Sequence, residues 1–192
     1  MTARRWGRND DPDAAVRRIL EAADKAFVEL GVARAGMGEV ARFAGCSRGT
    51  LYRYFASRDA LHRAYVRHKA ASIHRLAAQA AAGIGDPRVR LVEYVLAAVR
   101  AVRNDPAAAA WFVTDVSGLA ARYSRSIDAI ESFAAGIAPD FPGALGADGD
   151  RTLRLRWLVR VIVSLLADPE PREADERALI ERFAIPAYLG EA

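Results

Sequence analysis

The chain has little of what stabilises secreted or membrane proteins. Its 192 residues include a single cysteine, Cys46, which excludes an internal disulfide and permits a reducing compartment. No uninterrupted apolar stretch is long enough to span a bilayer. Residues 1–8 are polar and basic, and no apolar signal region follows them. We therefore expect a cytoplasmic protein that has no membrane partner.

The sequence also has few of the alternating β-branched runs that are typical of strands. Alanine is abundant and 52% of the residues are hydrophobic, which favours an all-α fold with a substantial core. An N-cap acid is followed by a proline at the first helical position in Asp11-Pro12, Asp86-Pro87 and Asp105-Pro106. With the glycine and proline breaks, they predict a helix from Ser57 to about Ala82, a loop over 139–150, and helices over 12–30, 87–103, 106–117, 119–138, 151–167 and 173–189.

Residue arrangements typical of enzymes are missing. His62, His68 and His74 are six residues apart, so each is turned by about 240° from the last on a helix and they do not converge on a metal. We expect these histidines on the surface. The sequence has no glycine-rich phosphate loop and no serine beside an acid–base pair. It therefore predicts no catalytic residue, no metal and no cofactor, with a helical enzyme that uses an apolar cavity as the alternative.

Residues 36–61 read as two short helices joined by a tight turn at Gly45-Cys46, followed by the start of a third helix. This arrangement presents the second helix to a DNA major groove. At 100° per residue, Leu51 and Phe55 share one side of that helix, and Gly49 and Arg53 point away from it. The pattern predicts a DNA-binding helix whose outer face is centred on Gly49 and Arg53.

The residue types on this helix suit the parts of a DNA site. Gly49 allows close approach, and the guanidinium of Arg53 can bind guanine O6 and N7 together. Arg48 is a second candidate for a base or a phosphate. Three hydroxyls are suited to phosphate oxygens, those of Thr50, Tyr52 and Tyr54.

Charge is unevenly distributed along the chain. Residues 1–69 carry 14 basic and 8 acidic side chains, a formal charge of +6, whereas residues 70–192 carry 14 and 16, a charge of −2. A basic segment attached to a mildly acidic one is typical of a nucleic-acid-binding module joined to another unit. A membrane surface would also attract such a segment, so charge alone does not identify the partner.

The stretch from Ala44 to Phe55, followed by Ser57-Arg58-Asp59-Ala60-Leu61, resembles the tetracycline-repressor (TetR) family of bacterial regulators. That family ends its recognition helix in Thr-Leu-Tyr-x-Tyr-Phe and continues with Ser-Lys-Glu-x-Leu. The resemblance implies about nine helices, with a DNA-binding head at residues 1–60 and a ligand-binding and dimerisation body at 61–192. It also implies a homodimer that binds a palindromic double-stranded DNA operator and represses until a small, mainly apolar effector binds.

The resemblance implies further DNA contacts, and the sequence departs from the family pattern at two places. Gly36 and Met37 stand where the family often has a threonine that caps the helix and touches phosphate, so Met37 is included in the expected DNA-binding set. Gly38 occupies a position that reads bases in some members, which leaves the base contacts to Arg48 and Arg53. Arg58 replaces the family's lysine, and we expect it to contact phosphate.

The remaining assignments concern the body. Aromatic and polar residues between 87 and 142 are the candidates for lining a ligand pocket: Tyr94, Trp111, Phe112, Asp115, Arg122, Tyr123 and Phe133. Apolar residues near the C-terminus are the candidates for a dimer interface: Leu155, Leu158, Ile162, Leu165, Leu166, Ile180 and Phe183. Both sets could instead form the protein's own core. A module that binds a protein partner through its last two helices is the second alternative function.

Overall fold

The structure is a computed structural model that describes residues 11–112 and 148–189, with side chains from residue 152 onward in the second range. These residues form helices and no strand. The elements are α1 Pro12–Leu30, α2 Met37–Ala44, α3 Arg48–Tyr54, α4 Arg58–Ala81, α5 Pro87–Arg103, α6 Pro106–Ala109, α9 Asp148–Ala167, α10 Glu173–Leu179, the π-helical segment η1 Ile180–Ala184, and α11 Ile185–Leu189. In the same residues no helix is both long and apolar enough to cross a bilayer.

The Asp-Pro pairs at Asp11, Asp86 and Asp105 begin helices as predicted. Asp86 accepts hydrogen bonds from the backbone N–H of Arg88 and Val89 at 2.7 and 3.2 Å, and Asp105 accepts them from Ala107 and Ala108 at 3.0 and 3.1 Å. Asp11 accepts one from Asp13 at 3.2 Å. These bonds satisfy N–H groups that have no partner within the helix, and they fix the first residues of α1, α5 and α6.

Three predicted boundaries differ from the structure. The α-helix expected over 106–117 ends at Ala109 and continues as a turn to Phe112, and α9 begins at Asp148 rather than at 151. The helix expected over 173–189 contains the π-helical segment η1, where the backbone carbonyl of Ala184 accepts a hydrogen bond from the Trp157 indole at 3.3 Å. The helix expected over 119–138 lies outside the described residues.

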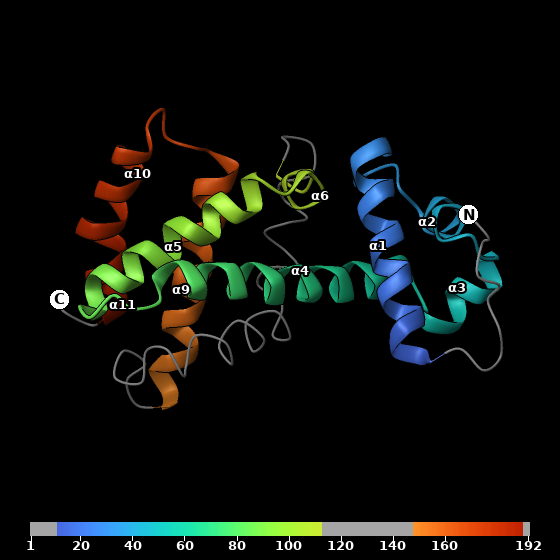
Figure 1. Cartoon of the computed structure of the whole chain (residues 1–192), viewed down its shortest axis with the longest axis horizontal. Coiled ribbons are helices and arrows are strands. Elements are labelled where there is room, and N and C mark those ends of the chain that lie inside the picture. Colours follow the sequence, from blue (N-terminus) through green and yellow to red (C-terminus); the bar gives the residue numbers. More distant parts are fainter. Residues whose placement is uncertain (1–10, 113–147, 190–192) are drawn as a thin grey trace.

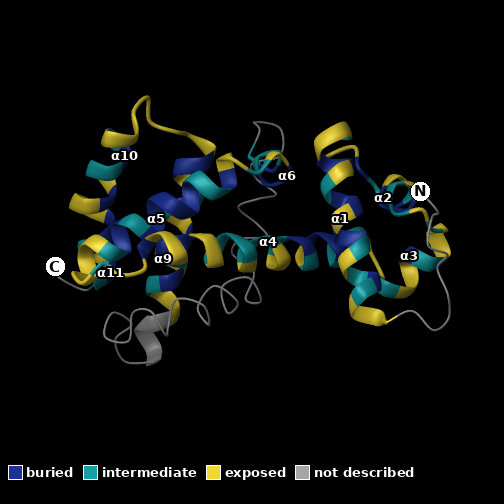
Figure 2. Cartoon of the chain, in the orientation of Figure 1, coloured by how far each residue is buried: buried dark blue, intermediate teal, exposed yellow. Residues whose placement is uncertain are grey.

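The long helix α4 is shared by two groups of helices (Figure 1). Helices α1, α2 and α3 gather at one end of α4, and α5, α9, α10 and α11 gather at the other, with α6 between them. Figure 2 shows buried residues on α4 both beside α1 and beside α5. We call the first group the head and the second the body.

Each group has its own apolar core. The head core contains Phe27, Leu51 and Leu61, and it extends along α4 to Tyr65. The body core is built mainly on α5, with Leu91 and Tyr94 fully buried. Trp111, in the turn after α6, packs in the head core although the chain has already passed through the body.

Most residues of the predicted dimer interface are instead part of the body core. Six of the seven candidates are buried within this chain, namely Leu155, Leu158, Ile162, Leu165, Leu166 and Ile180. The five residues on α9 lie on a side that packs against α5 and α11 of the same chain, and Ile180 of η1 is buried in the same core, so none of the six is available to a partner. Phe183 alone of the set is exposed, at 65% of its surface.

Ion pairs fasten α10 to α5. The carboxylate of Glu176 is 1% exposed and accepts hydrogen bonds from Arg103, which also donates to the backbone carbonyl of Leu165 at 2.9 Å. Arg177 pairs with Glu93 in the same way across the two helices. A buried carboxylate needs such partners because its desolvation is otherwise costly.

The head is fastened to the start of α4 by Arg58. Its guanidinium donates hydrogen bonds to the backbone carbonyls of Val32 and Ala33 at 2.6 and 2.7 Å, in the connection between α1 and α2. One terminal nitrogen of the guanidinium, Nη2, is thus used inside the protein, and the expected contact of Arg58 with DNA phosphate stays a prediction.

We predict that Arg58→Ala lowers the free energy of unfolding by about 1.5–3 kcal/mol, the usual value for hydrogen bonds made by a charged group. Chemical denaturation followed by circular dichroism measures this change. Arg63→Ala is the matched control, because Arg63 only pairs with Asp59 on the surface of the same helix and its loss should change stability by less than about 1 kcal/mol. Equal effects of the two substitutions would contradict a structural role for Arg58.

Candidate DNA-binding surface and ligand cavity

The turn between α2 and α3 sets the direction of α3. Gly45 lies in the left-handed region, with φ 65° and ψ 34°, which glycine adopts without strain. The N–H of Cys46 then bonds to the carbonyl of Ala41 at 3.0 Å. Ser47 caps α3 by accepting a hydrogen bond from the N–H of Thr50 at 3.0 Å. The tight turn predicted at Gly45-Cys46 is therefore present.

Helix α3 buries one side and exposes the other, as its angular pattern predicts. Leu51 and Phe55 are buried in the head core. The exposed residues of the outer side are Arg48, Gly49, Tyr52 and Arg53. A basic and aromatic face without apolar cover is suited to a nucleic acid rather than to a protein core.

Local contacts hold several of these side chains. The guanidinium of Arg53 lies 5.2 Å from the centre of the Tyr54 ring and 3.4 Å from its hydroxyl. The Thr50 hydroxyl lies 2.9 Å from that of Ser47, so it is already engaged at the cap. A Cβ added at Gly49 would meet only Ser47 Oγ, at 3.8 Å, which is an ordinary contact. The fold itself therefore does not require glycine at position 49.

The structure corrects the expected role of Met37. Its side chain is 6% exposed and belongs to the head core, so it is not available to DNA. The position follows Gly36, whose N–H donates to the carboxylate of Glu39 at 3.1 Å at the start of α2. An apolar residue at this place completes the packing of α2 and leaves no hydroxyl for a phosphate.

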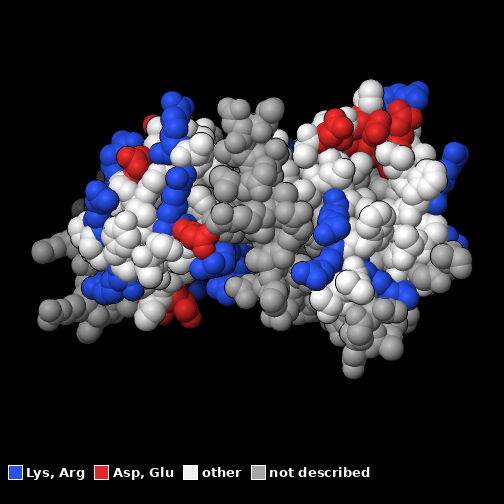
Figure 3. Space-filling model, turned by 180° about the vertical axis from the view of Figure 1, so that it is seen from behind, with Lys and Arg blue, Asp and Glu red and all other residues white. Residues whose placement is uncertain are grey.

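Charge is distributed over the described surface as the sequence indicates. Basic side chains are spread over the head, whereas acidic side chains gather near α10 at the other end of the molecule (Figure 3). Besides Arg48 and Arg53, the exposed basic residues of the head include Arg17, Lys25, Arg34 and Arg42. A field of this sign attracts the phosphate backbone of DNA independently of sequence.

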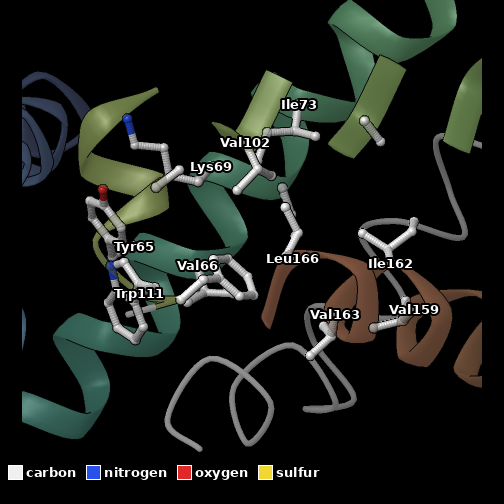
Figure 4. A pocket seen from close by; sticks show the side chains of 14 residues that line it. Tyr65, Val66, Lys69, Ile73, Val102, Trp111, Val159, Ile162, Val163 and Leu166 are labelled. Carbon is white, nitrogen blue, oxygen red and sulfur yellow. The ribbon is translucent and has the colours of Figure 1, made fainter. Parts of the chain in front are cut away.

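The body contains an apolar cavity of about 120 Å³ between α4, α5, α9 and the turn after α6 (Figure 4). Trp111 and Phe112, two of the expected pocket residues, line it. Tyr94 does not line it and is fully buried in the body core, where its hydroxyl lies 2.7 Å from His74 Nδ1. Asp115, Arg122, Tyr123 and Phe133 lie outside the described residues.

Much of the cavity wall comes from α4 and α9, which the sequence reasoning did not assign to it. The α4 residues are Tyr65, Val66, Lys69, Ala70 and Ile73, and those of α9 include Val159 and Ile162. On α4 they recur at the three- to four-residue spacing of one helical face. That spacing was a usable signal, but the face could equally have belonged to the core.

Two polar groups of the cavity wall connect it to the head. Lys69 Nζ lies 2.9 Å from Asp24 of α1 and 2.8 Å from Asp105, the N-cap of α6. The Tyr65 hydroxyl donates to Asp24 at 2.7 Å. We call Asp24, Lys69 and Asp105 the charge bridge.

Lys69 and Asp105 stay ionised at neutral pH. Burial opposes the charged form of Lys69, but hydrogen bonds to Asp105 and Asp24 raise its pKa above the ordinary value. Burial likewise opposes the charged form of Asp105, and its bonds to Lys69 and to backbone N–H groups lower its pKa. Burial, followed by the hydrogen bond to Asp24, raises the pKa of the Tyr65 hydroxyl far out of the physiological range.

Aromatic contacts accompany the charge bridge. The Phe27 ring of α1 meets Tyr65 edge-on at 4.8 Å between centroids and Trp111 edge-on at 5.5 Å. Tyr65 and Trp111 stack at 5.6 Å with an interplanar angle of 12°. The same two rings therefore touch both the cavity and the head.

The histidines of α4 also differ from their expected surface positions. His62 is buried against Phe27 and Trp111, and His74 contacts Tyr94, whereas His68 is exposed. The first two face the apolar cores because α4 has packed neighbours on more than one side. In residues 11–112 and 148–189, no group of three His, Cys, Asp or Glu side chains could hold a metal ion.

Comparison with known proteins agrees with this geometry. The sequence pattern described as "Bacterial regulatory proteins, tetR family" matches residues 19–65. An uncharacterised HTH-type transcriptional regulator of Mycobacterium tuberculosis is 40% identical over 176 residues, which cover 91% of this chain and 85% of that protein.

Solved structures share the fold over nearly the whole chain. A TetR transcriptional regulator from Rhodococcus sp. RHA1 is 26% identical with a TM-score of 0.67, covering 93% of this chain and 98% of that one. The TetR family repressor AlkX of Dietzia sp. strain DQ12-45-1b, implicated in the biodegradation of n-alkanes, is 21% identical with a TM-score of 0.69, over 97% and 99%. These proteins are regulators and not enzymes. The chain belongs to the TetR family of bacterial transcriptional regulators, and its head contains a DNA-binding helix-turn-helix.

Proposed function

We propose that the protein is a cytoplasmic repressor that binds a palindromic operator as a homodimer and is released by a small, mainly apolar effector. Residues 1–60 form the DNA-binding unit and residues 61–192 the effector-binding and dimerisation unit. The observation that carries the proposal is the outer face of α3, where Arg48, Gly49, Tyr52 and Arg53 are exposed together beside a fully packed inner face.

We assign some exposed residues of α3 to contacts with DNA bases and others to contacts with the DNA phosphate backbone. Arg53 lies against Tyr54, which limits its freedom while leaving it exposed, and a guanidinium held in this way is suited to guanine O6 and N7. Arg48 is at the first position of α3, beside the free N–H groups of the helix N-terminus, and it is suited to a base or a phosphate. The hydroxyl of Tyr52 is suited to a phosphate oxygen, and it is the most exposed aromatic hydroxyl of the helix.

A homodimer would bring two such heads to successive turns of DNA, and an exposed apolar face of the body suits it. That face comprises Leu153 and Trp157 of α9 with Leu179 and Phe183 of α10 and η1. The two parts adjoin, because the Trp157 indole donates to the carbonyl of Ala184, the residue after Phe183. Of the interface predicted from the sequence, this proposal keeps Phe183 and replaces the six buried residues.

For an effector in the cavity to change DNA binding, residues that line the cavity must also contact the head. Tyr65, Lys69 and Trp111 line the cavity and also contact α1 or its core. An effector that binds best when these side chains are rearranged would favour the arrangement of the heads that does not fit the operator.

A protein-interaction module is the competing function, and the same apolar face of Trp157 and Phe183 would serve it. It requires no sequence-specific contact from α3. The two functions therefore differ in what the loss of Arg53 does.

The proposal is tested by selecting bound fragments from a random duplex library and measuring the affinity of the selected sequence against salt. We expect an enriched palindrome and a steep loss of affinity with salt. Arg53→Ala should weaken binding to the selected site by about 1–3 kcal/mol and relax preference at one base position in each half-site.

Arg75→Ala is the matched control, since it removes the same charge from an exposed position of α4 in the body and should leave the base preference unchanged. No enriched sequence, or full biological function in Arg53→Ala, would favour the protein-interaction module instead.

Gly49→Ala should separate stability from DNA binding. The added methyl meets only Ser47 Oγ at 3.8 Å, and alanine is the better helix former, so we expect a gain in the free energy of unfolding of up to about 1 kcal/mol. Affinity for the selected operator should nevertheless fall, because the methyl stands between α3 and the floor of the groove. Thermal denaturation and a fluorescence-anisotropy titration measure the two effects. Unchanged operator affinity would contradict close approach at Gly49.

Phe183→Glu should convert the dimer to monomer, because it places a charge on the proposed apolar interface. Sedimentation velocity at several protein concentrations measures the mass. Leu76→Glu is the matched control, since Leu76 is equally a large exposed apolar residue but lies on α4 away from this face. A dimer that survives Phe183→Glu would exclude this interface.

A further inference from the structure

We propose that the cavity selects an uncharged, compact apolar effector of about one ring, and that the charge bridge rejects carboxylates. This inference rests on the proposed effector role of the cavity, and it identifies the chemical class of that effector. It follows from the two polar side chains of the wall, the charges beside them, and the size of the space.

The hydroxyl of Tyr65 and two of the three N–H groups of Lys69 donate to carboxylates away from the cavity. The described lining is apolar except at Tyr65, Lys69 and the indole N–H of Trp111. The hydroxyl of Tyr65 donates to Asp24, and the ammonium of Lys69 donates to Asp24 and to Asp105. Figure 4 shows the Lys69 nitrogen and the Tyr65 oxygen at one end of the lining, with Ile162, Val163 and Leu166 at the other. On the described part of the wall an effector therefore meets mainly methyl, methylene and aromatic surface.

The local charge also disfavours an anion. A lone lysine in an apolar cavity would attract a carboxylate, but Lys69 is shared by two aspartates, so the charge bridge has a net charge of −1. Asp105 is further fixed as the N-cap of α6, through the N–H groups of Ala107 and Ala108. An entering carboxylate would have to displace one aspartate from Lys69 and leave it without an ion-pair partner, in addition to losing its own hydration.

The size of the described space suits a compact molecule. The space is about 120 Å³, and an apolar cavity of about 150 Å³ is known to hold benzene. Trp111 and Phe112 give it flat aromatic surface on one side, and Val159 and Ile162 give it branched aliphatic surface on another. One substituted ring is the class of molecule that this space and this lining accept without a large rearrangement.

The test compares toluene with benzoate, which carry the same ring and differ in a methyl and a carboxylate. Calorimetric titration of the full-length protein in a sealed cell at pH 7 measures both. We expect toluene to bind and benzoate to bind at least tenfold more weakly. Equal or tighter binding of benzoate, or no binding of toluene, would overturn the proposal.

Two variants and one control test whether toluene binds in this cavity and whether the charge bridge weakens benzoate binding. Val163→Phe, which fills the cavity from α9, should abolish toluene binding, and retained binding would place toluene elsewhere and overturn the proposal. Asp24→Asn reduces the net charge of the bridge to zero, so benzoate affinity should rise at least threefold. Asp13→Asn, the same change at an exposed position of α1, should leave it unchanged.

If Asp24→Asn does not fold, Asp105→Asn makes the same change in charge, and asparagine still caps α6. Unchanged benzoate affinity in the folded variants would overturn the role of the charge bridge. These titrations contain no DNA, so their failure is distinct from failure to select an operator. Binding of toluene by a protein that selects no operator would remove the repressor function and leave the cavity's preference intact.

Discussion

The packing of Phe27 against Tyr65 and Trp111 is the contact on which the rest of the structure depends. It joins α1 of the head to α4 and to the turn after α6, and the charge bridge lies beside it, with Lys69 Nζ 5.7 Å from the centre of the Tyr65 ring. Each aromatic pair contributes about 0.5–1.5 kcal/mol beyond its buried area, whereas partly exposed ion pairs contribute about 0–1 kcal/mol. The rings therefore contribute most of the free energy that holds the head against α4, and the charges orient α1 and α6 relative to Lys69.

This arrangement gives α4 two roles on one rigid element. Its 24 residues extend about 36 Å, enough to reach from the head core to the body core. Tyr65 and Lys69 lie where the two regions meet, so the side chains that line the cavity are the same ones that bond to Asp24 of α1. In the proposed function, coupling between effector and DNA would pass through α4, because this one helix contacts both the cavity and α1 of the head.

The arginines of the head show how surroundings assign different tasks to one residue type. Arg58 is held by two backbone carbonyls and stabilises the head, whereas Arg48 and Arg53 are exposed on the outer side of α3. The five donors of a guanidinium suit both tasks, and only the neighbouring groups distinguish them. A family motif alone cannot make that distinction, because it does not show the hydrogen bonds from Arg58 to the backbone of Val32 and Ala33.

The sequence by itself determined the helix starts at Asp11, Asp86 and Asp105 and the two sides of α3, because caps and helical periodicity act over a few residues. Only the tertiary structure decided which apolar side of α9 meets α5. Leu155 and Leu158 are inside and Trp157 is outside, although all three are apolar and periodicity fits either face. It also decided that Met37 and His62 are buried, and that α4 forms a wall of the cavity. Periodicity fixes which side chains share a face, but the neighbour that covers the face is set by contacts between residues far apart in the chain.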